Sequence, residues 1–225
     1  MMAISRLRRR ARFVALAALL LATGAVWLLR GPIFSRNFAA VEPGMFYRSA
    51  QPREELDSWI HAHGIRSIVN LRGGSMRDEF FRHEVQTAKD ANVALFQVPM
   101  SAVKRPRRAD LLTLIEIFES SDPPFLIHCK QGADRTGLAT AVYRMWQLGE
   151  PPEVAESTFA MKHAHFPFFG TQRLHEPLNE YRDWLRSNRL SHTQKRFRDW
   201  VCRVYKDKPP MRALATKADA PNNRR

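Results

Sequence analysis

The sequence predicts an α/β domain in which helices flank a central, mostly parallel sheet. Three short apolar runs, SIVNL at 67–71, ALFQV at 94–98 and FLIH at 125–128, have the composition of buried strands. Helical patterns separate these runs, and strands that alternate with helices are typical of parallel sheets. The length of 225 residues allows one such domain with appendages.

The remaining elements follow at short intervals. A brief strand is predicted at 45–47, and the turn RSAQP then leads into a helix at 52–63, where Pro52 suits the first turn. The sequence RGG after residue 71 ends the next strand. Helical patterns predict further helices at 78–91, 110–119, 136–148, 151–160, 174–188 and 193–205.

The N-terminus has the pattern of a membrane anchor. Five Arg precede an uncharged run from Phe13 to Leu29, which Arg30 ends. As a helix these 17 residues would extend about 25 Å, the short end of what crosses a bilayer. The Arg bias predicts a single crossing with the following domain outside the cytoplasm, in the periplasm of a bacterium. A cleaved signal peptide that releases a secreted domain is the alternative, because Ala22, Gly24 and Ala25 could form a cleavage site.

We therefore divide the chain into four parts. Residues 1–30 form the signal-anchor, 31–44 a linker, 45–206 the α/β domain and 207–225 a basic, disordered tail.

The net charge of +14 is unevenly distributed. Residues 1–36 carry +7, residues 37–181 carry −2 and residues 182–225 carry +9. The middle of the chain is therefore nearly neutral, and we expect no nucleic-acid partner. A basic tail beside an anchor fits anionic lipid head groups better.

Cysteine usage argues against a metal site or a disulfide framework. Cys129 and Cys202 are the only two cysteines, and neither belongs to a C-x-x-C pair. We expect no metal and no cofactor.

The stretch HCKQGADRTG, 128–137, has the features of a phosphate-binding loop. It joins the strand at 125–128 to a helix, so successive backbone N–H groups and the helix N-terminus can surround an anion. Gly132 and Gly137 allow the backbone to curl and to approach closely. Arg135 can bind two oxygens of a phosphate with its planar guanidinium. We assign the binding loop to His128, Lys130, Gln131, Gly132, Ala133 and Gly137.

Cys129 is the predicted nucleophile. A pKa lowered from the ordinary value near 8.5 to about 5.5 would favour the thiolate by roughly 4 kcal/mol. The thiolate can attack phosphorus and form a thiophosphate that water hydrolyses. Thr136 is predicted to hydrogen-bond the sulfur as it leaves. His128 is interpreted as a packed residue that organises the loop. Lys130 either meets a second phosphate or is merely solvated.

This stretch matches the pattern C-x5-R-[ST]-G, and the chain resembles the protein tyrosine phosphatase superfamily, in particular compact bacterial dual-specificity-like members. The resemblance covers residues 41–185 and includes YRSAQP at 47–52. It implies a central sheet flanked by helices and hydrolysis of phosphomonoesters.

The general acid departs from the family pattern. Dual-specificity phosphatases place an Asp about thirty residues before the cysteine, but the corresponding loop here, 99–108, contains no acid. Asp110 is the nearest carboxylate, and its position favours a helix N-cap. Asp134 is the stronger candidate, because myotubularin-like and bacterial lipid-active phosphatases carry an acid at that loop position. Phosphorylated proteins are the first predicted substrates; a membrane lipid or envelope glycan phosphate is the alternative, and a silent phosphate-binding module the third.

Overall fold

The computed structural model of the chain describes residues 10, 13–24, 26, 35–166 and 170–207. Its strands form a five-stranded sheet in the order β1-β2-β5-β3-β4. Strands β2, β5, β3 and β4 are parallel, and β1 pairs with β2 antiparallel at one edge. The mostly parallel sheet predicted from the sequence is therefore confirmed, as a mixed sheet with one antiparallel edge. The strands are β1 (Ala39–Glu42), β2 (Phe46–Ala50), β3 (Ser67–Asn70), β4 (Ala94–Gln97) and β5 (Phe125–Cys129).

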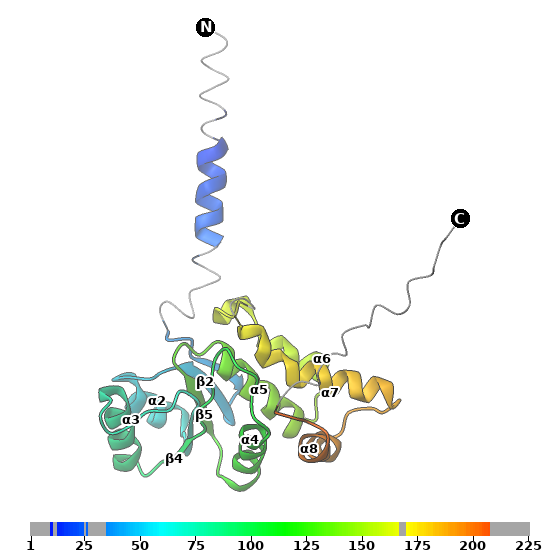
Figure 1. Cartoon of the computed structure of the whole chain (residues 1–225). Helices are drawn as coiled ribbons and strands as arrows, with labels where there is room; N and C mark the ends of the chain where they lie inside the picture. The colour runs from blue at the N-terminus through cyan, green and yellow to red at the C-terminus, as the bar shows by residue number, and fades with distance from the viewer. Residues whose placement is uncertain (1–9, 11–12, 25, 27–34, 167–169, 208–225) are drawn as a thin grey trace.

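Helices cover both faces of this sheet (Figure 1). The α-helices are α2 (Glu55–His63), α3 (Glu79–Asp90), α4 (Arg108–Ser120), α5 (Asp134–Trp146), α6 (Pro152–Ala155), α7 (Glu176–Ser187) and α8 (Gln194–Arg203). Three short 3-10 helices lie between α6 and α7: η1 (Glu156–Thr158), η2 (Met161–His163) and η3 (Thr171–His175).

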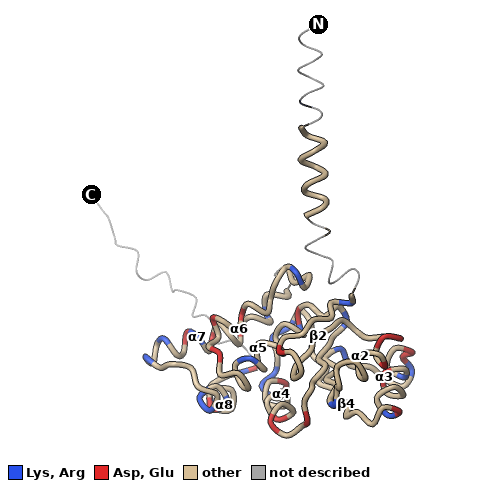
Figure 2. The backbone as a smooth tube through the Cα atoms, turned by 180° about the vertical axis from the view of Figure 1, so that it is seen from behind, with Lys and Arg blue, Asp and Glu red and all other residues tan. Residues whose placement is uncertain are grey.

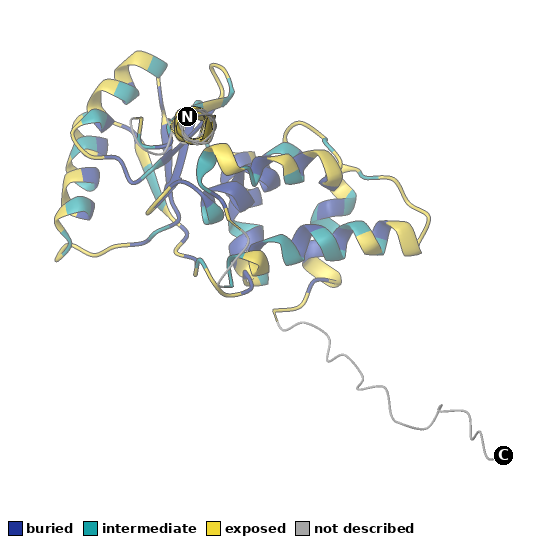
Figure 3. Cartoon of the chain, turned by 90° about the horizontal axis from the view of Figure 1, so that it is seen from above, coloured by how far each residue is buried: buried dark blue, intermediate teal, exposed yellow. Residues whose placement is uncertain are grey.

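Alternate residues of the central strands supply two separate cores. Ile68 and Leu126 pack in a cluster with residues of α2, whereas Val69 and Ile127 pack in a larger cluster with α4 and α5. This alternation follows from the period of two along a strand. Because both faces are covered, the strands read as continuous apolar runs, which is why they were recognisable in the sequence. Figure 3 shows the buried residues gathered in the strands and on the helix faces turned toward them.

Several boundaries differ from the sequence prediction; α2 begins at residue 55 rather than 52, and α6 ends at residue 155 rather than 160. The predicted linker 31–44 contains β1, a four-residue edge strand with only intermediate or exposed residues, so the folded domain begins before residue 45. Strand β2 continues through Ala50, where a turn was predicted, because the polar residues Arg48 and Ser49 are buried in the sheet. Polar residues do not follow the apolar pattern of a buried strand, so the end of β2 was not predicted from the sequence.

The N-terminal segment is helical at residues 13–24. Its apolar side chains are uncovered; Leu19, Leu20 and Leu21 are more than 60% exposed. Residues 1–9, 11–12, 25 and 27–30 of the predicted anchor, and residues 208–225 of the predicted tail, lie outside the described residues. Within the described ranges, no helix combines the length and the hydropathy required to span a bilayer.

Charges are mixed over the folded domain. Figure 2 shows Lys and Arg interspersed with Asp and Glu along its helices and loops. This distribution agrees with the nearly neutral middle of the sequence.

Candidate active site

The phosphate-binding loop leaves the carboxyl end of the central strand β5. Cys129 is the last residue of β5 and is 2% exposed, and α5 begins at Asp134. Arg135 and Thr136 follow in the first turn of α5. The structure therefore brings the predicted nucleophile, arginine, threonine and acid together at one strand-to-helix junction. Lys130 and Gln131 are exposed at this junction, whereas Gly132 and Ala133 are buried.

Four successive carbonyl groups of this loop accept hydrogen bonds on the side away from the concave face. In a trans peptide the N–H of the next residue points the opposite way. The amides of residues 131–134 are therefore directed to the concave side of the loop, where they can bind an anion together with the N-terminus of α5. Three of these bonds come from elsewhere in the fold: Gln51 N to Lys130 O (3.4 Å), Asn37 Nδ2 to Gln131 O (3.0 Å) and Arg48 Nη2 to Gly132 O (2.7 Å). The fourth, Gly137 N to Ala133 O (2.8 Å), is the first hydrogen bond within α5.

Gly132 is required by both conformation and space. Its φ is +68°, which L side chains rarely adopt. A Cβ at this position would lie 2.5 Å from the Ala50 nitrogen in β2. Gly137 has a different reason to be glycine, since a Cβ there would lie 2.9 Å from the Phe159 ring. Gly132 shapes the loop, and Gly137 allows Phe159 to pack against α5.

Arg48 supports the loop from the sheet. Its side chain is 1% exposed, and its guanidinium donates to the Gly132 carbonyl and to Thr158 O (3.1 Å). Burial lowers the pKa of Arg48 to about 10, an effect that the neighbouring Cys129 opposes. Arg48 is therefore a buried cation near the nucleophile at neutral pH.

His128 lies behind the loop in a buried polar cluster. It is 0% exposed, and its Nε2 contacts Glu84 Oε1. Glu84, also 0% exposed, accepts a hydrogen bond from Asn70 Nδ2 (2.8 Å). Asn70 Oδ1 in turn accepts from the backbone of Arg72 (2.8 Å) and Gly73 (2.9 Å). His128 is thus buried in a cluster that reaches the end of β3, and its role in organising the loop stays a prediction.

Arg135 lies between the loop and the segment after β4. Its Nη1 donates to Leu71 O and Met100 O, both at 3.2 Å. Its Nε is buried and has no partner among the described residues. The Thr136 hydroxyl is likewise buried without a partner in the described part of the chain, so its bond to sulfur stays a prediction.

The two candidate acids have different surroundings. Asp110 lies at the third position of α4 and accepts from the backbone N of Arg107 (3.0 Å), so it belongs to a capping box rather than standing at the N-cap as predicted. Asp134 Oδ1 lies 2.7 Å from His165 Nδ1, and the Asp134 side chain is 15% exposed. Asp134 therefore remains a candidate general acid at the phosphate-binding loop, whereas the carboxylate of Asp110 caps the N-terminus of α4.

Sequence reasoning missed several residues of the site. Asn37, Arg48, Glu84 and His165 are held to the loop only by the tertiary fold. Glu84 had one usable signal, because it falls on the buried stripe of α3 with Phe81 and Ala88. In the described ranges, no group of three or more His, Cys, Asp or Glu is arranged to hold a metal.

A nucleophilic cysteine, a loop of inward amides and an arginine at the start of a helix define a site of the protein tyrosine phosphatase superfamily. Residues 36–174 match the family model described as DSP-PTPase phosphatase fused to NAD+ kinase. This match covers more than half of the chain, and the chain belongs to this dual-specificity-type phosphatase family.

Individual relatives share part of their sequence with the chain. Inositol diphosphatase SIW14 of Saccharomyces cerevisiae is 33% identical over 117 residues, which cover 49% of this chain and 40% of the relative. Dual specificity protein phosphatase TpbA of Pseudomonas aeruginosa is 26% identical over 165 residues, which cover 62% and 69%. The chain thus spans less than half the length of SIW14.

Solved structures share the fold. The core catalytic domain of SIW14 from S. cerevisiae has a TM-score of 0.51 at 25% identity and covers 70% of this chain and 96% of that one. A Tk-PTP structure has a TM-score of 0.51 at 20% identity, with 67% and 97% covered.

Proposed function

We propose that the chain hydrolyses phosphate monoesters through a phosphocysteine intermediate on Cys129. The observation that carries this proposal is that the carbonyls of loop residues 130–133 are all bound by hydrogen-bond donors, which leaves the intervening amides to face the concave side of the loop. Such a loop stabilises a dianion and the trigonal-bipyramidal charge of phosphoryl transfer.

Each of the two steps of the reaction is assigned to named residues. The Cys129 sulfur attacks phosphorus, the bond from phosphorus to the leaving oxygen breaks, and Asp134 gives that oxygen its proton. Water then attacks the phosphocysteine, the S–P bond breaks, and Asp134 takes up a proton from the water. Arg135, held by the Leu71 and Met100 carbonyls, binds the equatorial oxygens in both steps.

Phosphorylated proteins are the first substrate class. TpbA, which aligns over 62% of the chain, is named a dual specificity protein phosphatase. The exposed side chains of Lys130 and Gln131 at the loop leave its mouth open to a bulky substrate.

A densely phosphorylated small molecule is the second candidate. SIW14 is named an inositol diphosphatase. Arg135 also has other arginines near it: burial and the positive charges of Arg135 and Arg53 lower the pKa of Arg72, and the charges of Asp78 and Glu84 oppose this. Clustered cations favour a polyanion.

A substrate panel separates these classes. Full-length protein would be assayed with phosphotyrosine and phosphoserine peptides, an inositol diphosphate and a phosphoinositide, each with and without vanadate. Preference for the peptides supports the first class, and preference for the inositol diphosphate supports the second. The phosphoinositide tests the lipid alternative, which the names of the relatives do not favour.

The nucleophile is tested by Cys129→Ser with Cys202→Ser as the matched control. We expect Cys129→Ser to lower turnover of p-nitrophenyl phosphate at least about 1,000-fold, because a hydroxyl is a far weaker nucleophile. Phosphate binding should survive, since the backbone loop remains. Cys202 is exposed on α8, so its variant should keep full activity. Turnover by Cys129→Ser would contradict the covalent mechanism.

We also infer that the N-terminal segment holds the domain at a membrane, on its extracytoplasmic side. The exposed leucines of residues 13–24 and the five preceding Arg support this location.

A further inference from the structure

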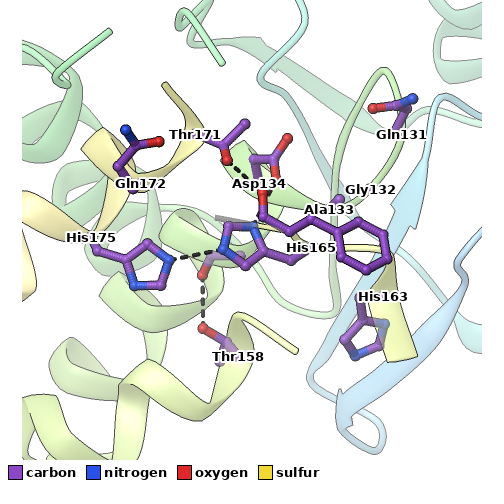
Figure 4. A network of polar contacts seen from close by, with 12 residues as sticks. Gln131, Gly132, Ala133, Asp134, Thr158, His163, His165, Thr171, Gln172 and His175 are labelled. Carbon is purple, nitrogen blue, oxygen red and sulfur yellow. Dashed lines mark hydrogen bonds and ion pairs between the residues drawn. The ribbon is translucent and has the colours of Figure 1, made fainter. Parts of the chain in front are cut away.

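A chain of polar contacts leads from Asp134 away from the phosphate-binding loop (Figure 4). Asp134 Oδ1 lies 2.7 Å from His165 Nδ1, and His165 Nε2 lies 2.8 Å from His175 Nε2. His175 Nδ1 lies 3.2 Å from Glu156 Oε1, and Glu156 Oε2 accepts a bond from Arg182 Nη1 (2.9 Å). The mechanism proposed above uses only the first of these groups.

The contacts fix the number of protons that the chain holds. Three contacts join Asp134, His165, His175 and Glu156, and each requires one proton between its two heavy atoms. Two neutral imidazoles supply two protons, so a third is needed for all three hydrogen bonds. The third proton can lie on Asp134, His165, His175 or Glu156 without breaking any of the three bonds. Its loss leaves two acceptors facing each other in a buried place, which is costly.

The groups around His175 disfavour placing the third proton on its ring. Burial lowers the pKa of His175, and the neighbouring His165 adds to this effect; the hydrogen bond and charge of Glu156 and the charge of Asp134 oppose it without reversing it. Arg182 balances the charge of Glu156 at the far end. The third proton is thereby left to the Asp134–His165 contact, in which it can pass between the two groups.

We propose that His165 and His175 form a proton relay that positions Asp134 and keeps a proton available to it as general acid. When the P–O bond breaks, Asp134 releases its proton to the leaving oxygen and becomes a carboxylate. The relay is then one proton short, and the water that hydrolyses the phosphocysteine restores it through Asp134. This inference rests on the function proposed above.

The chain next to His165 is also bound to the phosphate-binding loop by contacts that do not involve the relay. Asn37 Nδ2 donates to both Gln131 O (3.0 Å) and His163 O (2.8 Å). Its Oδ1 lies 3.0 Å from His163 Nδ1. Because this second attachment remains when His165 is changed, substitutions in the relay leave the segment anchored.

The test uses His165→Asn in the full-length chain. An Asn amide can still donate to Asp134 from near the position of Nδ1, but it cannot reach His175 or carry the third proton. We expect phosphoserine hydrolysis to fall at least about tenfold at pH 7.5, and the alkaline side of its kcat profile to move about one pH unit toward acid. Hydrolysis of p-nitrophenyl phosphate, whose leaving group needs little protonation, should change less than about twofold.

Two further variants complete the design. His175→Gln keeps a polar group near Nε2 but cannot exchange the proton, and it should give the same shift in the pH profile. His192→Asn is the control, because His192 contacts Tyr181 Oη (3.0 Å) and Met145 O (3.1 Å) away from the loop. It should alter stability alone and leave the pH profile unchanged.

The outcomes separate this inference from the function on which it rests. A wild-type chain without Cys129-dependent turnover would overturn both. Asp134→Asn could instead slow hydrolysis of phosphoserine and of p-nitrophenyl phosphate by the same factor, while His165→Asn keeps wild-type rates and pH profile. That result would overturn both the relay and the assignment of Asp134 as general acid. His165→Asn could also keep full phosphoserine hydrolysis and an unshifted kcat–pH profile while Asp134→Asn loses this activity. In that case His165 would only position Asp134 through a hydrogen bond, and the relay alone would be overturned.

Discussion

Gly132 shows how one residue couples the phosphate-binding loop to the sheet. Its positive φ lets the chain reverse between Gln131 and Ala133, and its missing side chain lets the loop lie against the backbone of Ser49 and Ala50 in β2. Because Arg48 donates to the Gly132 carbonyl from the same strand, the contact sets the direction of the peptide groups that bind phosphate.

Gly132→Ala should therefore cost both stability and activity. The conformational strain alone is worth about 1–2 kcal/mol, and the Cβ would also meet backbone atoms 2.5 Å away, which cannot move without shifting β2. Gly149→Ala is the matched control, because Gly149 has a φ of +66° but no atom nearer than 4.0 Å. Denaturant unfolding should show a larger loss for Gly132→Ala, with activity lost only there. Equal losses would mean that strain, not packing against β2, is decisive.

At the scale of elements, the segment after β4 is held in place by Arg105. Its side chain is 4% exposed and donates to Glu180 of α7 (Nη2 to Oε2, 2.7 Å) and to Glu176 (3.1 Å). Its Nε donates to Lys206 O (2.9 Å), and its guanidinium lies 4.3 Å from the Tyr205 ring centroid. The same segment presents the Met100 carbonyl to Arg135, so Arg105 indirectly supports the arginine predicted to bind phosphate.

Arg105→Lys should lower the free energy of unfolding by about 1–3 kcal/mol, because a lysine cannot replace a planar, bidentate group in a buried place. We expect the loss of unfolding free energy to be nearer about 1 kcal/mol, because Glu176 and Glu180 are about one-third exposed and water screens their charges. We also expect a lower kcat through looser support of Arg135. Arg107→Lys is the control; its side chain is 64% exposed, and the change should stay within about 0.5 kcal/mol. A similar loss in both variants would contradict the anchoring role.

The elements also show what a sequence can predict. The central strands were predictable, because burial on both faces makes them continuous apolar runs, and so was the Cys129–Gly137 stretch, because its chemistry is local. Strand β1 was missed because an edge strand buries little, and the end of β2 because Arg48 is buried by partners 84 and 110 residues away. His165 lies in a segment recognised only as rich in His and Phe; its pairing with Asp134 across 31 residues depends on packing alone.

The whole molecule combines a folded domain with an N-terminal helix that it does not cover. Figure 1 shows the helix of residues 13–24 directed away from the sheet, and its leucines are exposed. Exposed apolar side chains on one helix, next to a cluster of arginines, would favour aggregation in water and insertion at a membrane.

Reporter fusions test this arrangement at both ends of the chain. With a single crossing, a reporter active only outside the cytoplasm should function when fused after Arg225, and a reporter active only in the cytoplasm should fail there. The charge bias is the cause, since five arginines precede the apolar run and only Arg30 and Arg36 follow it before the domain. Replacing the five arginines, Arg6, Arg8, Arg9, Arg10 and Arg12, with Gln should reduce the extracytoplasmic signal several-fold while the Cys129-dependent activity of detergent-solubilised protein is unchanged. Cytoplasmic reporter activity in the unaltered chain would contradict the topology, whereas a soluble, shortened product would show cleavage after the apolar run.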